Sequence, residues 1–424
     1  MDYPSSMPRA LTTIAVATAL VLGLVVGFFA PFRELREVTV TETLTITHTV
    51  AGGDMRTITV TSLTTVEKIL TTTETVEVTR EVRNPPLMLD LSHARLFEVV
   101  FQDGYKVVKD ANNRTLLLIP RGAAPPAGVG GIVVQVPVER VVLLSSTQAA
   151  LLVRLMEYRP EIIDTIAGIA WGGEYEWYLE DIKEALEENR IRDVGAAWQP
   201  DFEAILALNP DVMFIYTFPG STLPAKLDEV GVVYAVDNEW LENTALGRFE
   251  WIRFLATFYN MDYEAWLIIR EVEGRISEII SKIRAADQPP PKVAWFSIFK
   301  GKVYVSRGES YVANALYDLG ADYIFKDIKG TGSITVTLEE LVTRVIDADV
   351  IIYSSTRIES KEDILKEAPE LADSKAFIED RVYIFAPPYW QLGLAYTDEW
   401  YLDLAAILYP ELFKGHNPTL FRKL

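Results

Sequence analysis

The sequence predicts an α/β protein with two lobes of mainly parallel sheet, joined by one long rigid helix and preceded by a transmembrane anchor and a threonine-rich stalk. Three observations support this fold class. Short apolar stretches alternate with helical patterns in two separate regions, which is typical of parallel sheets covered by helices. A long amphipathic stretch, residues 262–286, lies between the two regions. An uncharged stretch and a threonine-rich stretch precede both.

Composition narrows the classes of function. The chain has 424 residues, of which 49% are hydrophobic, enough for two or three domains. Its net charge of −20 argues against nucleic acid or an anionic membrane surface as partner. The absence of cysteine excludes disulfides, thiolate sites and a lipid-anchored N-terminal cysteine. The three histidines, His48, His93 and His416, show no paired-ligand spacing, so no metal site or cofactor is expected.

The N-terminal region reads as a membrane anchor. Residues 1–9 are polar and are expected to form a cytoplasmic tip, and residues 10–32 carry no charge over a length that can span a bilayer. A cleaved signal peptide would need small residues before the cut, but Phe28 and Phe29 precede Ala30. An uncleaved signal-anchor fits better. It predicts a single-pass protein of the cell membrane whose globular part is extracellular.

Residues 33–86 are predicted to form a stalk. Sixteen of the 43 residues from 38 to 80 are threonine, a composition typical of O-glycosylated or solvated stalks. The alternation would also suit strands, but large apolar residues are too few for a core. The sequon that begins at Asn113 is a candidate N-glycosylation site and is compatible with an external location.

An N-terminal lobe is predicted over residues 96–243. It opens with an antiparallel hairpin or meander at 97–120, with turns at Gly104 and at Asn112-Asn113. Repeated strand–helix units follow. The expected strands are 138–146, 164–170, 211–217 and 232–237, and the expected helices are Thr147–Tyr158, Glu176–Glu188, Asp201–Leu208 and Pro224–Val230.

Linking helices are predicted over residues 244–288, and the most regular of them runs from Asp262 to Ala286. Asp262 is the expected N-cap, and the three prolines from Pro289 prevent continuation. A helix of about 25 residues spans roughly 35–40 Å, which suits a strut between two lobes. A core-facing helix of one larger domain is the alternative. Isoleucine and valine recur on one face at three- and four-residue steps: Ile269, Val272, Ile276, Ile279, Ile280 and Ile283.

A C-terminal lobe is predicted over residues 289–424, because the strand–helix pattern restarts after the prolines. The expected strands are 292–299, 302–306, 349–355 and 381–386, and the expected helices are Ser310–Leu319, Leu338–Val345, Lys361–Ala372 and Asp398–Leu408.

One unit occurs in both lobes. Residues 200–212 and 336–350 each hold a short helix with an early glutamate, Glu203 or Glu339, and then an aspartate before a buried strand. A single such glutamate is explained by stabilisation of the helix dipole. A matching pair, one on each lobe, favours a role at an interface.

The blocks at 139–152, 193–216, 306–328 and 336–342 resemble the substrate-binding proteins of ABC importers for ferric siderophores, haem and cobalamin. The resemblance covers about residues 96–424. It implies that the long helix is a rigid bridge and that a ligand lies in the cleft between the lobes. It also implies that Glu203 and Glu339 dock with arginines of the permease subunits, with Glu340 as an alternative for the second.

Ligand-binding residues are expected in the loops that follow the carboxyl ends of the parallel strands. Aromatic residues there indicate a large, flat or partly apolar ligand, although lobe packing alone would also use them. Arginines could pair with carboxylates or catecholates, or could be solvated surface charges. The candidates are Ser146, Thr147, Trp171, Trp198, Tyr216, Trp240, Arg307, Arg357, Tyr389 and Trp390. Tyr216 and Tyr389 are also hypothetical tyrosinate donors to iron, but a pre-chelated metal is favoured over a bare ion.

The resulting hypothesis is a monomeric, membrane-tethered receptor that captures a metal chelate and delivers it to ABC permease subunits. Two alternatives stay open. An enzyme is disfavoured because the sequence shows no Ser-His-Asp set, phosphate loop or cluster of metal ligands. A surface glycoprotein would explain the anchor and stalk, but it needs no cleft between twin lobes.

Overall fold

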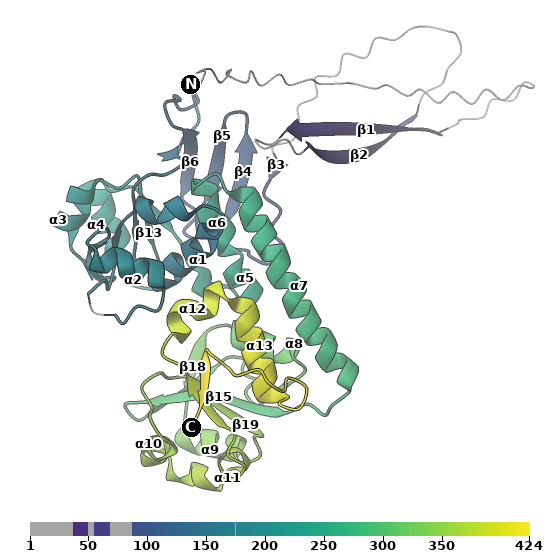
Figure 1. The fold of residues 1–424 in the computed structure, drawn as a ribbon, viewed down its shortest axis with the longest axis vertical. Coiled ribbons are helices and arrows are strands. Elements are labelled where there is room, and N and C mark those ends of the chain that lie inside the picture. Colours follow the sequence, from purple (N-terminus) through teal and green to yellow (C-terminus); the bar gives the residue numbers. More distant parts are fainter. Residues whose placement is uncertain (1–36, 50–54, 68–86, 174) are drawn as a thin grey trace, which may run out of the picture. The chain divides into compact units, whose positions relative to one another are not determined.

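The computed structural model describes residues 37–49, 55–67 and 87–424, except residue 174 (Figure 1). The chain divides into two compact units, Met1–Arg83 and Asn84–Leu424. In the first, strands β1 (Glu37–Thr49) and β2 (Met55–Glu67) pair antiparallel along their whole length. The predicted cytoplasmic tip and transmembrane span lie outside the described residues. Within the described ranges, no helix combines the length and apolar character needed to cross a membrane.

The second unit opens with a five-stranded sheet that we call the leading sheet. The meander predicted for residues 97–120 is confirmed: β3, β4, β5 and β6 pair antiparallel in order, and Gly104 takes a φ of 87° at the β4–β5 turn. The parallel pairing of β6 with β7 was not expected. The strands are β3 (Leu87–Met88), β4 (Glu98–Gln102), β5 (Tyr105–Lys109), β6 (Thr115–Pro120) and β7 (Ile132–Val136).

The N-terminal lobe is built on an all-parallel sheet in the order β10-β9-β8-β13-β14. Its central strands are short apolar runs buried on both faces, as expected for a parallel sheet between helices. The strands are β8 (Val141–Leu143), β9 (Ile166–Ile169), β10 (Arg192–Asp193), β13 (Val212–Ile215) and β14 (Tyr234–Val236). The helices are α1 (Ser146–Met156), α2 (Glu180–Glu187), α3 (Phe202–Leu208) and α4 (Leu223–Val230). A small hairpin, β11 (Gly195–Ala196) and β12 (Gln199–Pro200), precedes α3.

Three helices link the lobes: α5 (Ala245–Phe249), α6 (Trp251–Phe258) and α7 (Asp262–Ala286). The 25 residues of α7 match the predicted strut, which Figure 1 shows running beside both lobes. The predicted N-cap is wrong: Met261 occupies that position, and the Asp262 carboxylate instead accepts a hydrogen bond from Lys106 Nζ at 2.7 Å. Each buried isoleucine on its inner face contributes roughly 1.5–3 kcal/mol through burial.

The C-terminal lobe contains a mixed sheet in the order β18-β16-β15-β19-β20-β21, with β17 also paired to β15. The pairs β15–β19 and β19–β20 are parallel, and the flanking pairs β15–β16 and β20–β21 are antiparallel. Its strands are β15 (Lys292–Phe299), β16 (Lys302–Ser306), β17 (Asp322–Tyr323), β18 (Ser333–Val336), β19 (Val350–Tyr353), β20 (Val382–Phe385) and β21 (Phe421–Lys423). Its helices are α8 (Tyr311–Asp318), α9 (Leu338–Val345), α10 (Lys361–Glu367), α11 (Lys375–Ile378), α12 (Tyr389–Ala395) and α13 (Thr397–Leu408).

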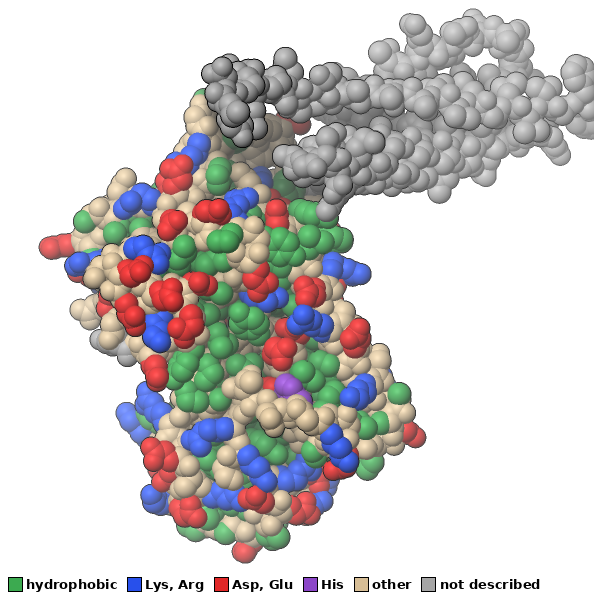
Figure 2. All heavy atoms as spheres, in the orientation of Figure 1, with side chains coloured by type: hydrophobic (Ala, Val, Ile, Leu, Met, Phe, Trp, Pro, Cys, Tyr) green, Lys and Arg blue, Asp and Glu red, His purple; other side chains and the backbone are tan. Residues whose placement is uncertain are grey.

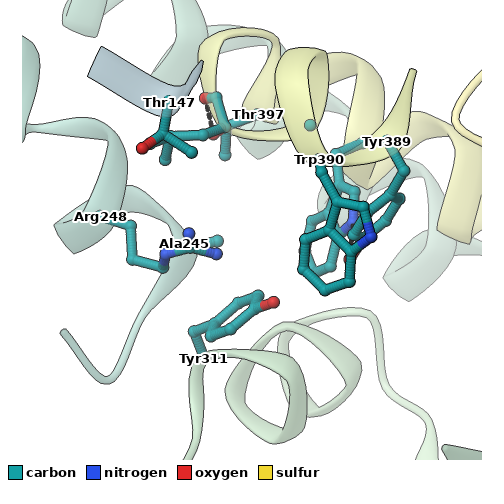
Figure 3. A pocket seen from close by; sticks show the side chains of 10 residues that line it. Thr147, Ala245, Arg248, Tyr311, Tyr389, Trp390 and Thr397 are labelled. Atoms are coloured by element: carbon teal, nitrogen blue, oxygen red, sulfur yellow. Dashed lines mark hydrogen bonds between the residues drawn. The ribbon is translucent and has the colours of Figure 1, made fainter. Parts of the chain in front are cut away.

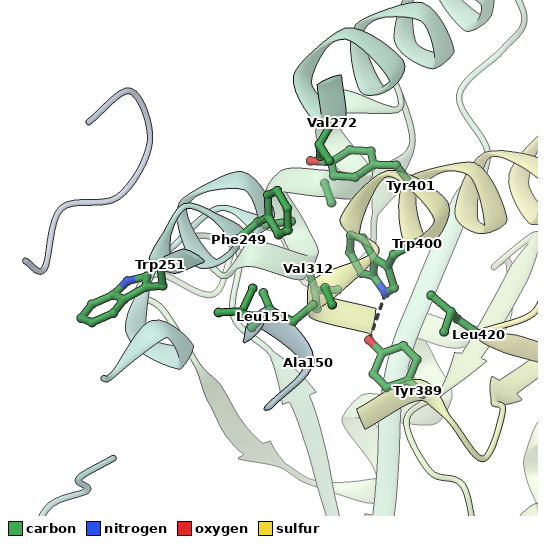
Figure 4. Close-up of a cluster of buried hydrophobic side chains, with 14 of the residues drawn as sticks. Ala150, Leu151, Phe249, Trp251, Val272, Val312, Tyr389, Trp400, Tyr401 and Leu420 are labelled. Carbon is green, nitrogen blue, oxygen red and sulfur yellow. Dashed lines mark hydrogen bonds between the residues drawn. The ribbon is translucent and has the colours of Figure 1, made fainter. Parts of the chain in front are cut away.

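The two lobes share one hydrophobic core. A single cluster of buried side chains runs from α1 through the linking helices to α12, α13 and β21. Figure 4 shows Leu151 of α1, Phe249 of α5 and Val312 of α8 in the same cluster as Trp400 of α13. A second cluster covers the other face of the N-terminal lobe sheet. The lobes are therefore packed together through helices, which limits their independent motion.

Two buried carboxylates fix the segment between β3 and β4 to the linking helices. Glu250 accepts hydrogen bonds from the backbone N–H groups of Ser92, His93 and Ala94 at 2.7–3.0 Å. Glu242 accepts from the backbone N–H groups of Arg95 and Leu96 at 2.8 and 3.1 Å. Because charged acceptors bind N–H donors strongly, these contacts attach the leading sheet firmly to the body.

Candidate functional site

Four cavities lie where parallel strands of the two lobes end. They form one tract, because neighbouring cavities share lining residues: Phe218, Trp240, Tyr311 and Trp390 each line two of them. On the face shown in Figure 2, charged side chains are scattered over both lobes and hydrophobic ones gather between them. We call the tract formed by the four cavities the cleft.

One cavity formed by both lobes has a volume of about 260 Å³. Trp240 faces it from the N-terminal lobe, and Trp390 faces it from α12. Both indoles are substantially exposed, at 39% and 51%. The wall from the C-terminal lobe carries five serines: Ser297, Ser306, Ser310, Ser333 and Ser354.

A smaller cavity lies among α1, α5, α8 and α12. Figure 3 shows Arg248 and Tyr311 facing it from one side and Trp390 from the other. The Arg248 guanidinium lies 4.3 Å from the centre of the Tyr311 ring, and its Nε donates to Glu239 Oε2 at 2.7 Å. Burial lowers the pKa of the Arg248 guanidinium, but the Glu239 carboxylate and the neighbouring Tyr311 and Tyr389 together raise it above its ordinary value.

Tyr389 and Trp390 are neighbours with different environments. The Tyr389 ring stacks on Phe385 at 3.6 Å, and its hydroxyl accepts a hydrogen bond from Trp400 Nε1 at 3.1 Å. Burial raises the pKa of Tyr389 well above its ordinary value, and burial also raises the pKa of Tyr216. Both tyrosines therefore favour the neutral phenol. Of the two neighbours Tyr389 and Trp390, only Trp390 presents a large exposed ring face to the cavity.

The N-terminal lobe contributes a cavity of about 420 Å³ and a smaller one beside it. The larger lies between the β5–β6 turn, which contributes Asn112, and the loops after β13 and β14. Trp198 and Tyr216 line the smaller one. Trp171 packs edge-to-face on Trp198 at 4.4 Å and has a φ of 64°, which is strained for a bulky residue.

Of the ten predicted cleft residues, six line these cavities. They are Thr147, Trp198, Tyr216, Trp240, Tyr389 and Trp390. Trp171 lies beside them through its contact with Trp198, whereas Ser146 lines none of the four. Arg307 is half-buried, with Nη1 at 3.4 Å from the Lys329 carbonyl, and Arg357 is exposed on the loop after β19. Neither lines the four cavities.

Sequence reasoning missed Arg248, Tyr311, Asn112 and the serine wall. Arg248 lies on a short linking helix that follows no strand, so a search of strand ends could not find it. Tyr311 is the first residue of α8 and directly follows the N-cap Ser310. The capping signal in the sequence could therefore have drawn attention to Tyr311. Asn112 was recognised only as a turn residue, because the docking of this turn beside β14 is a tertiary contact.

The paired glutamates occupy equivalent positions on the two lobes. Glu203 is exposed in the first turn of α3, whose N-cap Asp201 accepts from the Glu203 and Ala204 backbone N–H groups. Glu339 is exposed in the first turn of α9. Glu340 is half-buried and pairs with Arg344 at 3.0 Å, so Glu339 is the freer of the two.

Two lobes around a cleft lined by aromatic side chains define a solute-binding protein. A model of the periplasmic binding protein family matches residues 141–389, and the chain belongs to this family. Members of the family are non-enzymatic components of transport. Within the described residues, no group of three or more histidine, aspartate or glutamate side chains is arranged to hold a metal ion.

The chain is also similar to a curated relative and, in fold, to solved structures. The chain is 39% identical over 330 residues to an uncharacterized lipoprotein of Methanocaldococcus jannaschii, covering 75% of this chain and 78% of the relative. It is similar in fold to a periplasmic haem-binding protein of Pseudomonas aeruginosa (TM-score 0.53, 19% identity, 68% of this chain and 98% of the other). A triscatecholate siderophore binding protein of Bacillus subtilis is also similar (TM-score 0.50, 22% identity, 65% and 94%).

Proposed function

We propose that the protein is a membrane-tethered, extracytoplasmic receptor that captures a metal chelate (a ferric siderophore, haem or a corrinoid) for an ABC importer. One observation carries the proposal: Trp240 and Trp390, from different lobes, line the same cavity. Two exposed indoles can hold a large ligand with flat or apolar surfaces. Haem and a ferric siderophore are named as ligands of the structurally similar proteins.

A pre-chelated metal suits this cleft better than a bare ion. A bare ferric ion needs several anionic oxygen or nitrogen ligands. The cleft tyrosines Tyr216 and Tyr389 have raised pKa values and remain neutral phenols. A chelate brings its own ligands, so the receptor only has to recognise the outer surface of the complex.

Delivery to the permease would use the glutamates on the two lobes. Glu203 and Glu339 are exposed on separate helices, and their charges suit cationic pockets on a membrane partner. The lobes in this proposal are residues 96–243 and 289–424, joined by residues 244–288. The leading sheet of the structure begins earlier, at Leu87.

Tethering is proposed through residues 10–32, with residues 33–86 as the stalk. The named lipoprotein relatives support attachment to a membrane. This chain has no cysteine to carry a lipid, so a hydrophobic segment would replace the lipid anchor. Asn113 lies exposed in the β5–β6 turn, and we propose it as a glycan acceptor.

Fluorescence titration of the purified full-length chain tests the receptor function. Coloured chelates (haemin, cobalamin and several ferric siderophores) should quench tryptophan emission saturably for one compound. Trp240→Ala and Trp390→Ala should each weaken that binding at least about tenfold, as expected for loss of a buried aromatic contact. Trp266→Ala, which removes a similarly exposed indole on α7 outside the cavities, should not. Absence of saturable quenching by every chelate would contradict the proposal.

A further inference from the structure

The walls of the cleft are almost free of charged residues. Of all residues that line the four cavities, only Arg248 and Glu242 carry a formal charge. The two cavities on the N-terminal lobe have none, although 24% of the residues of the chain are charged. A wall with so few charges limits the kinds of ligand that the cleft can bind.

Both of those charges already have partners. Arg248 donates to Glu239 at 2.7 Å, which balances its charge inside the protein. Glu242 accepts from two backbone N–H groups and from Trp251 Nε1 at 3.2 Å. The charge of Arg248 is therefore balanced within the protein, and hydrogen bonds hold the Glu242 carboxylate in place.

The polar groups that do line the cleft are neutral hydroxyls and amides. Serines form the wall on the C-terminal lobe, and Asn112, Thr217, Ser221 and Asn238 line the cavity on the other lobe. Asn238 is held in place, because its side chain accepts from Thr217 N at 2.7 Å and donates to Thr217 Oγ1 at 2.9 Å. Hydroxyl and amide groups match carbonyl, amide and hydroxyl groups on a ligand.

We infer that the ligand is an electrically neutral chelate, recognised by stacking on indoles and by hydrogen bonds to hydroxyl and amide groups; this rests on the proposed receptor function. A ferric tris-hydroxamate and an amide-rich corrinoid have this chemistry. A ferric tris-catecholate is strongly anionic, and haem carries two propionates. Burying their charge without a counter-ion is unfavourable, and the net charge of −20 further disfavours anions.

Calorimetric titration of the full-length chain with two neutral and two anionic chelates tests the inference. A neutral ferric tris-hydroxamate or cobalamin should bind about 10- to 100-fold more tightly than a ferric tris-catecholate or haemin, which corresponds to the cost of an imperfectly paired charge. Its affinity should also change little between low and high salt.

A cation introduced into the wall should weaken the preference for neutral chelates. Asn112→Lys places a cation at the cavity on the N-terminal lobe and should narrow the gap between neutral and anionic chelates. Asp103→Asn makes the same change of net charge on the same sheet but outside the cavities, and should leave the gap unchanged. Tighter binding of an anionic chelate by the unmodified chain would overturn the inference and leave the receptor function standing. If none of the four chelates binds, both proposals fail.

Discussion

Gln391 and Tyr178 join the two lobes through a side chain on one and a backbone group on the other. The Gln391 Oε1 accepts from Tyr178 N at 2.8 Å, and Nε2 of the same amide donates to the Glu176 carbonyl at 2.7 Å. Gln391 is 2% exposed, so water does not compete for these bonds. The amide therefore fixes α12 to the loop before α2.

Gln391→Ala should destabilise the protein by about 1–3 kcal/mol, because two hydrogen bonds between the lobes are lost. Chemical denaturation gives this free energy of unfolding. Amide hydrogen exchange at Tyr178 should accelerate in the variant. The exposed Gln199→Ala is the matched control, and equal stability of the two variants would show that the contact is unimportant.

Ligand binding should change the overall dimensions of the protein little. The uninterrupted α7 and the shared core oppose a hinge motion, which usually requires loops between the moving parts. Small-angle scattering with and without a bound chelate measures this directly. A clear decrease in the radius of gyration on binding would contradict the rigid-bridge interpretation.

Glu203→Ala and Glu339→Ala should impair permease docking while leaving ligand affinity nearly unchanged, because neither residue lines the cleft. Each should weaken binding to reconstituted permease, and the double variant should weaken it more than either single one. Glu229→Ala, on α4, controls for the loss of one surface charge. Loss of chelate affinity in both variants would refute the docking role.

Asp237 should make stability fall as pH rises above 3.8. Burial raises its pKa well above the ordinary value of 3.8, and the Glu239 carboxylate raises it further. Its contribution to stability is then fully present below pH 3.8 and is lost as pH rises through the raised pKa. Asp237→Asn should therefore raise the melting temperature at pH 8 relative to the unmodified chain and flatten its pH dependence. The exposed Asp103→Asn should do neither.

Glu250→Ala should cost about 3–5 kcal/mol of stability, since it removes a fully buried carboxylate and leaves Arg253 without its ion-pair partner. The loss should appear first at the leading sheet, as faster hydrogen exchange at His93 and Ala94. Glu278→Ala, exposed on α7, should change stability by less than about 0.5 kcal/mol. Similar unfolding free energies for the two variants would argue against this anchoring role.

Local patterns in the sequence predicted most elements of the fold. The boundaries of α7 were predictable because its isoleucines repeat with helical period and prolines follow it. Helix α12 was not predicted, because it is short, contains Gly393 and is stabilised by packing between lobes. The parallel β6–β7 pair was missed for a similar reason, since a crossover through residues 121–131 leaves no local signal.

The candidate site was predictable only in part. The strand-end rule located Trp240 and Trp390, whose loops face the cleft. It also selected Arg307 and Arg357, because it locates a loop but does not give the direction of each side chain. Arg248 entered the cleft from a linking helix, which no rule about strands considers.

The core shared by both lobes has a consequence for folding. Neither lobe contains a complete hydrophobic core of its own, because α1 of one lobe packs on α12 of the other. The linking helices contribute side chains to the same core. Residues 87–424 should therefore melt in one cooperative transition, and a lobe produced alone should remain unfolded. The chain therefore cannot be cut between its lobes into two parts that fold independently.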